Sequence, residues 1–246
     1  MPQRRERLDR LLAGRGFFEN QDLAARAVMA GKVSHSGKIL DKPGALIPVD
    51  AELSLEAAPK FVGRGGFKLE AALDRFGIDP AGRVCLDIGA STGGFTDCLL
   101  QRGASFVHAV DVGRGQLDWR LRGDARVAGH EGVNARFLGS VPFEPAPQMA
   151  VGDVSFISLV QILPPVFEKL PPGADLVFLI KPQFEVPKDT PIPGGVVRDA
   201  GLRTACVGKV KRCVLELGHT WVADMESPVA GRDGNIEHLA HMRAAG

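Results

Sequence analysis

Tyrosine is absent from this 246-residue sequence, which also has only two tryptophans and four cysteines. The cysteines show no Cys-x-x-Cys spacing and indicate reduced, buried thiols of a cytoplasmic protein; they are Cys85, Cys98, Cys206 and Cys213. No apolar run approaches the roughly 18 residues that a membrane span needs, and the charged start at Met1–Arg7 is followed by no signal-peptide core. These absences argue against a secreted or membrane-spanning protein.

A strong excess of charge is also absent, because the formal net charge is only +1. Residues 1–65 hold 11 Lys and Arg against 8 Asp and Glu, a net charge of +3, whereas the remainder holds 19 against 21, a net charge of −2. Any nucleic-acid surface must therefore come from local clustering of basic residues. The length suits one large domain, or a small domain followed by a medium one, and a hydrophobic content of 45% is enough for a core.

The most informative stretch is a short apolar strand, Val84–Ile88, followed by a glycine-rich loop, Gly89–Gly94, and a helix, Phe95–Gln101. Open α/β sheets build nucleotide pockets in this way, because glycines let the backbone approach a ligand and the helix N-terminus offers free N–H groups. A second strand, Phe106–Val110, ends at Asp111, whose carboxylate suits the two hydroxyls of a ribose. The stretch predicts a nucleotide site, with an ordinary strand–helix turn as the alternative.

Ser91 occupies the place of the second glycine in the dinucleotide fingerprint, which weakens the case for NAD. S-adenosylmethionine (SAM) has no pyrophosphate, and Asp87 at the strand end is suited to receive its ammonium group. Glu131 and Asn134, after a third strand, are candidates for the adenine side. The predicted cofactor-binding residues are Asp87, Gly89, Ser91, Gly93, Phe95, Asp111, Val112, Glu131, Asn134 and Asp153.

Residues 1–58 form a separate predicted domain, with helices at Arg7–Leu12 and Gln21–Ala30 and strands at 32–35, 38–40 and 51–55. The pattern Arg7-Leu8-Asp9, then Ala24-x-x-x-Val28-x-x-Gly31-Lys32-Val33 and Gly37, resembles the S4 RNA-binding domain. The basic residues of this domain are suited to binding RNA phosphates; the alternative is that they form a solvated helical face. The predicted RNA-binding residues are Arg4, Arg5, Arg7, Arg10, Arg15, Arg26 and Lys32. Residues 59–66 are predicted to be a linker, and residues 67–246 a second domain.

The second domain alternates strands and helices and predicts an α/β fold with an open, mostly parallel sheet that has an antiparallel end. The remaining expected elements are helices at 67–76, 157–170 and 199–217, strands at 127–134, 149–153, 175–180, 219–227 and 235–240, and a mobile lid at 187–197. Lys68 lies in the first turn of its helix, where a cation opposes the helix dipole. The segment Arg114–Arg122 has two interpretations: it contacts cofactor or RNA, or it is a short packing helix with Trp119 in the core.

Several motifs of the second domain together resemble the TlyA family: Asp87–Asp97, Asp111–Leu117, Asp153–Ile157, Ile180–Glu185 and Gly194–Asp199. That family, some of whose members carry the historical name hemolysin, joins an S4 domain to an FtsJ-like, class I SAM-dependent methyltransferase with a Rossmann-like, seven-stranded sheet. The resemblance implies SAM as the cofactor and 2′-O-methylation of cytidine in ribosomal RNA. It also implies a catalytic tetrad of Lys68, Asp153, Lys181 and Glu237, with no metal, no membrane partner and a monomer favoured.

The ribose 2′-hydroxyl is a poor nucleophile and must lose its proton, but a free lysine with a pKa of about 10.4 is mostly protonated. Burial and a neighbouring cation favour the neutral form of a lysine, whereas carboxylates favour the charged form. We therefore expect Lys181 to activate the hydroxyl, either as a base or as a cation that stabilises the alkoxide. The alternatives are an RNA-binding or ribosome-assembly protein with a vestigial methyltransferase fold, and a membrane-lytic protein.

Overall fold

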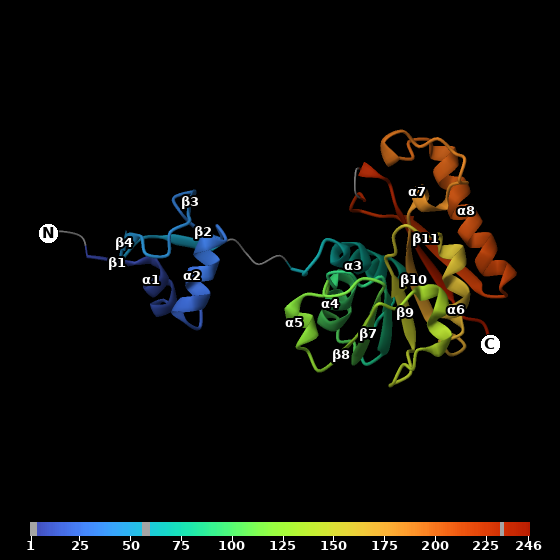
Figure 1. The fold of residues 1–246 in the computed structure, drawn as a ribbon, viewed down its shortest axis with the longest axis horizontal. Helices are drawn as coiled ribbons and strands as arrows, with labels where there is room; N and C mark the ends of the chain where they lie inside the picture. The colour runs from blue at the N-terminus through green and yellow to red at the C-terminus, as the bar shows by residue number, and fades with distance from the viewer. Residues whose placement is uncertain (1–3, 56–59, 232–233) are drawn as a thin grey trace. The chain divides into compact units, whose positions relative to one another are not determined.

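The structure is a computed structural model that describes residues 4–55, 60–231 and 234–246. The chain divides into two compact units, Met1–Lys60 and Phe61–Gly246, drawn from blue to red along the chain in Figure 1. No helix within the described ranges is both long enough and apolar enough to cross a membrane. Each unit has its own hydrophobic core, so each is described by itself.

The first unit packs two short helices against small antiparallel strands. Leu8, Leu12, Ala24 and Val28 are buried in its core, and the Asn20 side chain caps the second helix by accepting a hydrogen bond from the Leu23 N–H. Strand β1 pairs with β4, while β2 lies between β3 and β5. Its elements are β1 (Arg5–Arg7), α1 (Leu8–Gly14), α2 (Gln21–Met29), β2 (Val33–His35), β3 (Lys38–Leu40), β4 (Leu46–Pro48) and β5 (Leu53–Leu55). The sequence did not predict β1 or β4.

The second unit is built on a seven-stranded sheet in the order β11-β12-β10-β9-β6-β7-β8. Strand β12 is antiparallel to both of its neighbours, and the strands from β10 to β8 are parallel, so the predicted sheet with an antiparallel end is confirmed. The strands are β6 (Val84–Ile88), β7 (Phe106–Asp111), β8 (Val127–Glu131), β9 (Met149–Gly152), β10 (Asp175–Ile180), β11 (Thr220–Glu226) and β12 (His238–Arg243).

Helices cover both faces of this sheet, because the central strands are apolar on both faces. Cys85 on β6 faces the core shared with α3 and α4, and the next residue, Leu86, faces the core shared with α6 and α8. The helical elements are α3 (Gly65–Phe76), α4 (Gly94–Gln101), α5 (Trp119–Arg122), η1 (Ala135–Ser140), η2 (Leu159–Gln161), α6 (Leu163–Phe167), α7 (Pro182–Glu185), η3 (Pro193–Gly195) and α8 (Ala200–Glu216).

Two expected elements differ from the structure. The helix expected over 157–170, with a kink at its two prolines, is two separate pieces, η2 and α6, because Pro164 and Pro165 lack the N–H groups of a helix interior and instead stand in the first turn of α6. The strand expected from Asn235 begins at His238. The buried Asn235 instead accepts a hydrogen bond from the Val197 N–H and donates one to the Gly195 carbonyl, which ties down one end of the expected lid.

The start of the second unit lies inside the segment expected to be a linker. Phe61 is only 2% exposed and packs in the core with α3 and α4, with its ring 5.1 Å from that of Phe67. Gly66 has no side chain at the point where the Phe61 ring lies, which leaves room for this packing. Helix α3 begins at Gly65 rather than at Phe67. Farther along the chain, one of the two alternatives for Arg114–Arg122 is excluded, because Trp119 is 74% exposed and so is not in the core.

Candidate active site

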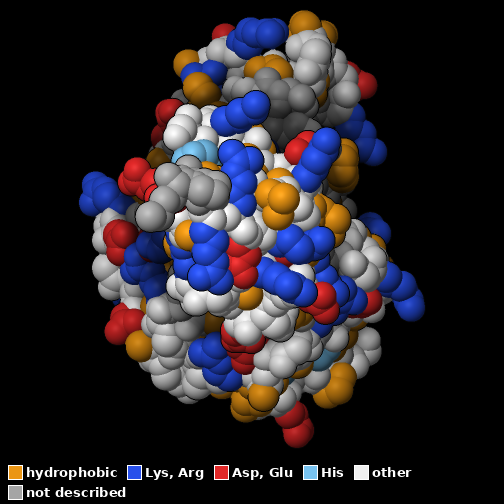
Figure 2. All heavy atoms as spheres, turned by 90° about the vertical axis from the view of Figure 1, so that its left-hand side faces the viewer, with side chains coloured by type: hydrophobic (Ala, Val, Ile, Leu, Met, Phe, Trp, Pro, Cys, Tyr) orange, Lys and Arg blue, Asp and Glu red, His pale blue; other side chains and the backbone are white. Residues whose placement is uncertain are grey.

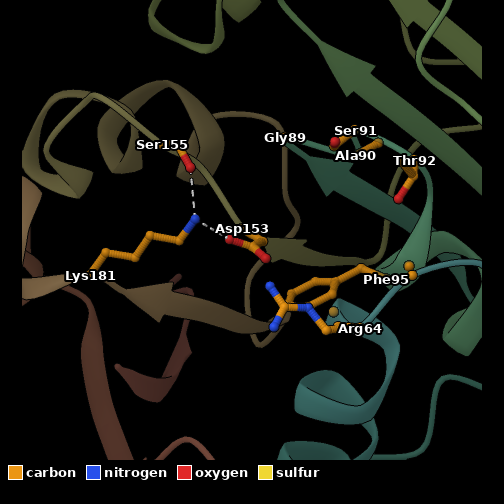
Figure 3. A pocket seen from close by; sticks show the side chains of 12 residues that line it. Arg64, Gly89, Ala90, Ser91, Thr92, Phe95, Asp153, Ser155 and Lys181 are labelled. Atoms are coloured by element: carbon orange, nitrogen blue, oxygen red, sulfur yellow. Dashed lines mark hydrogen bonds and ion pairs between the residues drawn. The ribbon is translucent and has the colours of Figure 1, made fainter. Parts of the chain in front are cut away.

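A cavity of about 190 Å³ opens at the C-terminal edge of the sheet in the second unit. The β6–α4 loop forms one wall, with Gly89, Ser91 and Thr92, and the approach to α3 forms another. Asp153 and Ser155, which follow β9, and Lys181, which follows β10, complete it (Figure 3). Side chains from three neighbouring strand ends therefore meet at one edge, where open α/β sheets bind their ligands.

Glycine is required in the loop because the neighbouring backbone comes too close for a side chain. Gly89 has a φ of +81°, and a Cβ there would lie 2.7 Å from the Asp153 carbonyl oxygen. A Cβ on Gly94 would lie 3.0 Å from the Gly66 nitrogen. The loop is thus drawn against both Asp153 and the start of α3, which brings distant parts of the chain to one cavity.

Lys181 is held at the cavity wall by two oxygen groups. Its Nζ lies 2.7 Å from Asp153 Oδ1 and donates a hydrogen bond of 2.8 Å to Ser155 Oγ (Figure 3). Strand β10 places the lysine and the parallel strand β9 places the aspartate, since these strands are neighbours in register. Two members of the predicted tetrad are therefore in direct contact, with a serine to which the sequence assigned no role.

Lys68 and Glu237 form the second contact within the tetrad. Their Nζ and Oε2 atoms are 2.6 Å apart, and the side chains are 9% and 2% exposed, respectively. This pair explains the lysine in the first turn of α3, because the buried carboxylate compensates for the helix dipole. Gly65, one turn earlier, lies against Asp153: a Cβ there would be 3.7 Å from Asp153 Oδ2. Helix α3 therefore begins beside Asp153, but neither Lys68 nor Glu237 is among the residues that line the cavity.

Asp111 lies in a small adjoining hollow with Ser91, Gln116, Leu117 and Glu131. Its Oδ2 accepts a hydrogen bond of 2.8 Å from the Ser91 N–H, and its Oδ1 accepts one of 2.7 Å from the Gly113 N–H. Each oxygen of a carboxylate has two lone pairs, so both can still accept from a ribose hydroxyl. Glu131 Oε1 accepts from the Gly115 N–H at 2.9 Å, which fixes this acid at the rim of the hollow.

Four predicted cofactor residues, Asp87, Gly93, Val112 and Asn134, do not line either hollow. Asp87 is fully buried, accepts a 2.6 Å hydrogen bond from Thr96 Oγ1, and has a pKa that burial raises to about 7. Val112 is 71% exposed, and the Asn134 side chain caps η1 by accepting from the Arg136 N–H. Their contact with a cofactor stays a prediction. Arg64 and Thr92 do line the cavity, although neither was among the predicted site residues.

Comparison with known proteins agrees with this geometry. The FtsJ-like methyltransferase family matches residues 61–244. The chain is 44% identical to the 16S/23S rRNA (cytidine-2′-O)-methyltransferase TlyA of Mycobacterium tuberculosis, over 98% of this chain and 90% of the relative. It is 40% identical to Hemolysin A of Brachyspira hyodysenteriae, over 96% of this chain and 98% of that protein. This chain is a TlyA-type member of the FtsJ-like methyltransferase family. The predicted family is thereby confirmed.

Solved structures give the same assignment of the fold. A Streptococcus thermophilus structure, described only as a candidate hemolysin, is 42% identical over 99% of this chain and 90% of that chain, with a TM-score of 0.74. A SAM-dependent methyltransferase from Mesorhizobium loti is only 17% identical, yet has a TM-score of 0.54 over 70% of this chain and 96% of that chain. The second unit of this TlyA-type chain therefore has the predicted class I methyltransferase fold.

All seven predicted RNA-binding side chains of the first unit are exposed. Two of them also bind within the unit: Arg7 forms an ion pair of 2.6 Å with Asp9, and Arg15 donates to the Val49 and Ala51 carbonyl oxygens. On the side of the molecule shown in Figure 2, Lys and Arg side chains are numerous and interspersed with Asp and Glu. The RNA-binding role of these residues stays a prediction.

Proposed function

We propose that this protein transfers a methyl group from SAM to the ribose 2′-hydroxyl of cytidine in ribosomal RNA. The observation that carries the proposal is Lys181, held by Asp153 and Ser155 at the wall of a cavity formed by the glycine-rich loop. Relatives that share at least 40% of its residues over nearly the whole chain include enzymes named for this reaction. A ribosomal RNA substrate agrees with the cytoplasmic location expected from the sequence.

The cavity and its adjoining hollow fit SAM. The loop at Gly89 and Ser91 leaves room for backbone contact with the amino-acid end, while Asp111 offers two carboxylate oxygens to the ribose. Glu131 lines the same hollow, pairs with Asp111 across β7 and β8, and suits the far end of the nucleoside. SAM supplies an electrophilic methyl sulfonium, so the protein need only bind it, align it and prepare the hydroxyl.

Lys181 is the residue that prepares the hydroxyl. During transfer the oxygen–methyl bond forms as the methyl–sulfur bond breaks, and the hydroxyl proton passes to a base or is balanced by a cation. Lys181 suits both roles because its amino group lines the cavity while its stem is anchored at the end of a buried strand. Asp153 orients it, and the buried Lys68–Glu237 pair stiffens the neighbouring start of α3. Holding the lysine in line with the reacting atoms supplies much of the acceleration.

The first unit is proposed to deliver the RNA. Its seven exposed basic side chains lie on a unit with its own core, and they fit phosphate binding better than chemistry. The division of the chain into Met1–Lys60 and Phe61–Gly246 accordingly suits a separation of RNA capture from methyl transfer. Residues 56–59 at that boundary lie outside the described residues.

Replacing Lys181 tests the function. Lys181→Ala should fold and bind SAM, yet lose transfer to ribosomal RNA by at least about 100-fold, the usual contribution of a positioned acid or base. Lys181→Arg should fail too, because a guanidinium stays protonated and has a different reach. Lys211→Ala, at an exposed position of α8, is the matched control and should keep the wild-type rate.

The assay is single-turnover transfer of labelled methyl from SAM to ribosomal RNA, followed by mapping of 2′-O-methyl cytidines. Near wild-type rates in Lys181→Ala would contradict the assignment of this lysine. A wild-type protein that binds ribosomal RNA but transfers no methyl group would instead support the vestigial alternative.

A further inference from the structure

The loop between β9 and η2, which we call the β9–η2 loop, carries two side chains of the cavity beyond the end of the sheet. The ladder between β9 and β10 ends at the pair Gly152–Phe178. Asp153, Ser155 and Lys181 lie beyond that pair, and the lysine contacts the other two (Figure 3). Because ladder hydrogen bonds hold neighbouring strands only as far as the ladder extends, other contacts must fix the loop against the segment that carries the lysine.

The backbone of the β9–η2 loop is strained at Phe156. Its φ is +64°, a conformation that is rare for a bulky residue and persists only where the surrounding contacts enforce it. Burial does not supply that enforcement, because Phe156 is 87% exposed, although its ring lies 5.2 Å from that of Phe184 on α7. A strained loop with an exposed ring therefore requires polar contacts to keep its place.

Those polar contacts converge on Glu185, which is only 2% exposed. Its Oε2 accepts a hydrogen bond of 2.6 Å from Ser158 Oγ, and its Oε1 accepts one of 2.6 Å from the Leu159 N–H. Lys209 of α8 lies 3.0 Å from Oε2 and also donates to the Glu185 carbonyl oxygen at 2.9 Å. Hydrogen bonds to an ionised carboxylate are about twice as strong as neutral ones, so this buried group joins the end of the loop firmly to α7.

Glu185 is not among the described residues that line the cavity, so it acts through its neighbours. Lys181 directly precedes α7, and Glu185 is the last residue of that helix. Ser158 ends the β9–η2 loop, because η2 begins at the next residue. The two segments are therefore joined twice, by Lys181 to Ser155 at the cavity and by Glu185 to Ser158 outside it. The outer bond limits how far the loop can move relative to the lysine.

We propose that Glu185 is a positioning residue for methyl transfer, which holds the β9–η2 loop against α7 and thereby keeps Lys181 directed into the cavity. Lys209 supports it by neutralising the buried carboxylate. The proposal rests on the methyl transfer proposed above, and it holds whether Lys181 acts as a base or as a cation. Positioning of this kind has a large effect on rate, because a displacement of about 1 Å can slow a reaction about 100-fold.

The test is single-turnover methyl transfer to ribosomal RNA by Glu185→Gln, at saturating SAM and at a temperature where thermal unfolding shows the variant folded. Glutamine keeps the size of the side chain but has one acceptor oxygen, which cannot serve all three donors of the carboxylate. We expect the rate to fall about 10–100-fold. Calorimetry should give a SAM affinity close to that of the wild type, because the proposed ribose site lies on β7.

Lys209→Met is a second, milder variant. It leaves the hydrogen bonds from the loop to Glu185 in place and removes the neutralising cation, so the rate should fall by a smaller factor of about 3–10. Glu216→Gln, at the exposed end of α8, is the matched control and should keep the wild-type rate.

Hydrogen exchange followed by mass spectrometry observes the loop itself. In Glu185→Gln the amides of residues 154–159 should exchange faster than in the wild type, because the Leu159 N–H loses its charged acceptor and the loop opens more often. Peptides from the first unit should exchange at the wild-type rate.

A wild-type rate of transfer by Glu185→Gln, with only the melting temperature lowered, would overturn the proposal, because the carboxylate would then serve stability alone. A lowered rate without faster exchange in residues 154–159 would overturn it as well. Both results leave the proposed function intact. If Glu185→Gln does not fold, a wild-type rate of Lys209→Met decides against the proposal. Absence of transfer by the wild type would overturn the proposed function and this proposal together.

Discussion

Replacing Glu237 by glutamine tests how far the buried ion pair with Lys68 stabilises the second unit. The two charged atoms lie 2.6 Å apart, and the side chains are almost fully removed from solvent. Glutamine keeps the size of the side chain and one carbonyl oxygen, but it removes the negative charge. The Lys68 ammonium would then be buried without a neutralising partner, and an unpaired buried charge strongly lowers the free energy of unfolding.

The magnitude follows from this geometry. Removing one partner of a buried pair costs about 3–5 kcal/mol, and the remaining amide oxygen places Glu237→Gln near the lower end. In a domain of this size each kcal/mol lowers the melting temperature by about 2–4 °C, so we expect a decrease of roughly 6–12 °C. Lys68→Met should also destabilise, because it leaves the Glu237 carboxylate buried alone. The double variant should lose less than the sum of the two single losses.

Thermal unfolding of the full chain, followed by circular dichroism at pH 7.5, measures these differences. Glu168→Gln changes an exposed glutamate at the end of α6 and is the matched control, with an expected change close to zero. A melting temperature for Glu237→Gln within about 2 °C of the wild type, or strictly additive losses in the double variant, would refute this account of the pair.

Three further predictions concern the cofactor hollow, the buried acid and the first unit. Asp111→Ala should weaken SAM binding by roughly 10–100-fold in calorimetry, because two hydrogen bonds to a carboxylate are lost, and equal binding would exclude the ribose contact. Burial raises the pKa of Asp87 to about 7, so the folded state binds this proton more tightly than the unfolded state and wild-type stability falls as pH rises from about 4 to about 7. Asp87→Asn removes this titrating carboxyl. The denaturant midpoint of the variant minus that of the wild type should therefore increase from pH 5 to pH 8, and a difference that stays constant would contradict the raised pKa of Asp87. Replacing Arg4, Arg5 and Arg10 together by alanine should weaken ribosomal RNA binding and reduce the slope of log K against log salt by up to about 2–3, whereas an unchanged slope would place the RNA surface elsewhere.

Local patterns in the sequence were sufficient for the elements whose residues lie close together in the chain. Val84–Ile88 is a strand, and the glycines after it turn the chain into α4, because strand burial and glycine conformation are local properties. The parallel sheet with an antiparallel end followed from the alternation of strands and helices. The motifs also identified the family, which the comparisons confirmed.

One error was local: periodicity suggested one helix over 157–170, but Pro164 and Pro165 stand in the first turn of a separate helix, α6. Other differences arose where a residue's neighbours are distant in the chain. The sequence left a core position for Trp119 open beside contact with cofactor or RNA, and only the structure shows that its ring is exposed. Phe61, in the expected linker, is buried against α3 and α4. Hydrophobicity favours a buried position for a side chain, but the packing of the surrounding elements determines whether a buried position is available.

The sequence by itself determined the family, the glycine-rich loop and the four residues expected to carry the chemistry. Only the tertiary structure decided how those residues pair. Lys68 and Glu237 are 169 positions apart and meet because α3 packs beside the approach to β12, while Asp153 and Lys181 meet because β9 and β10 are parallel neighbours. Ser155 joined Lys181 for the same reason. A hydrogen bond requires two atoms within about 3 Å, and that proximity results from the packing of whole elements rather than from any local pattern.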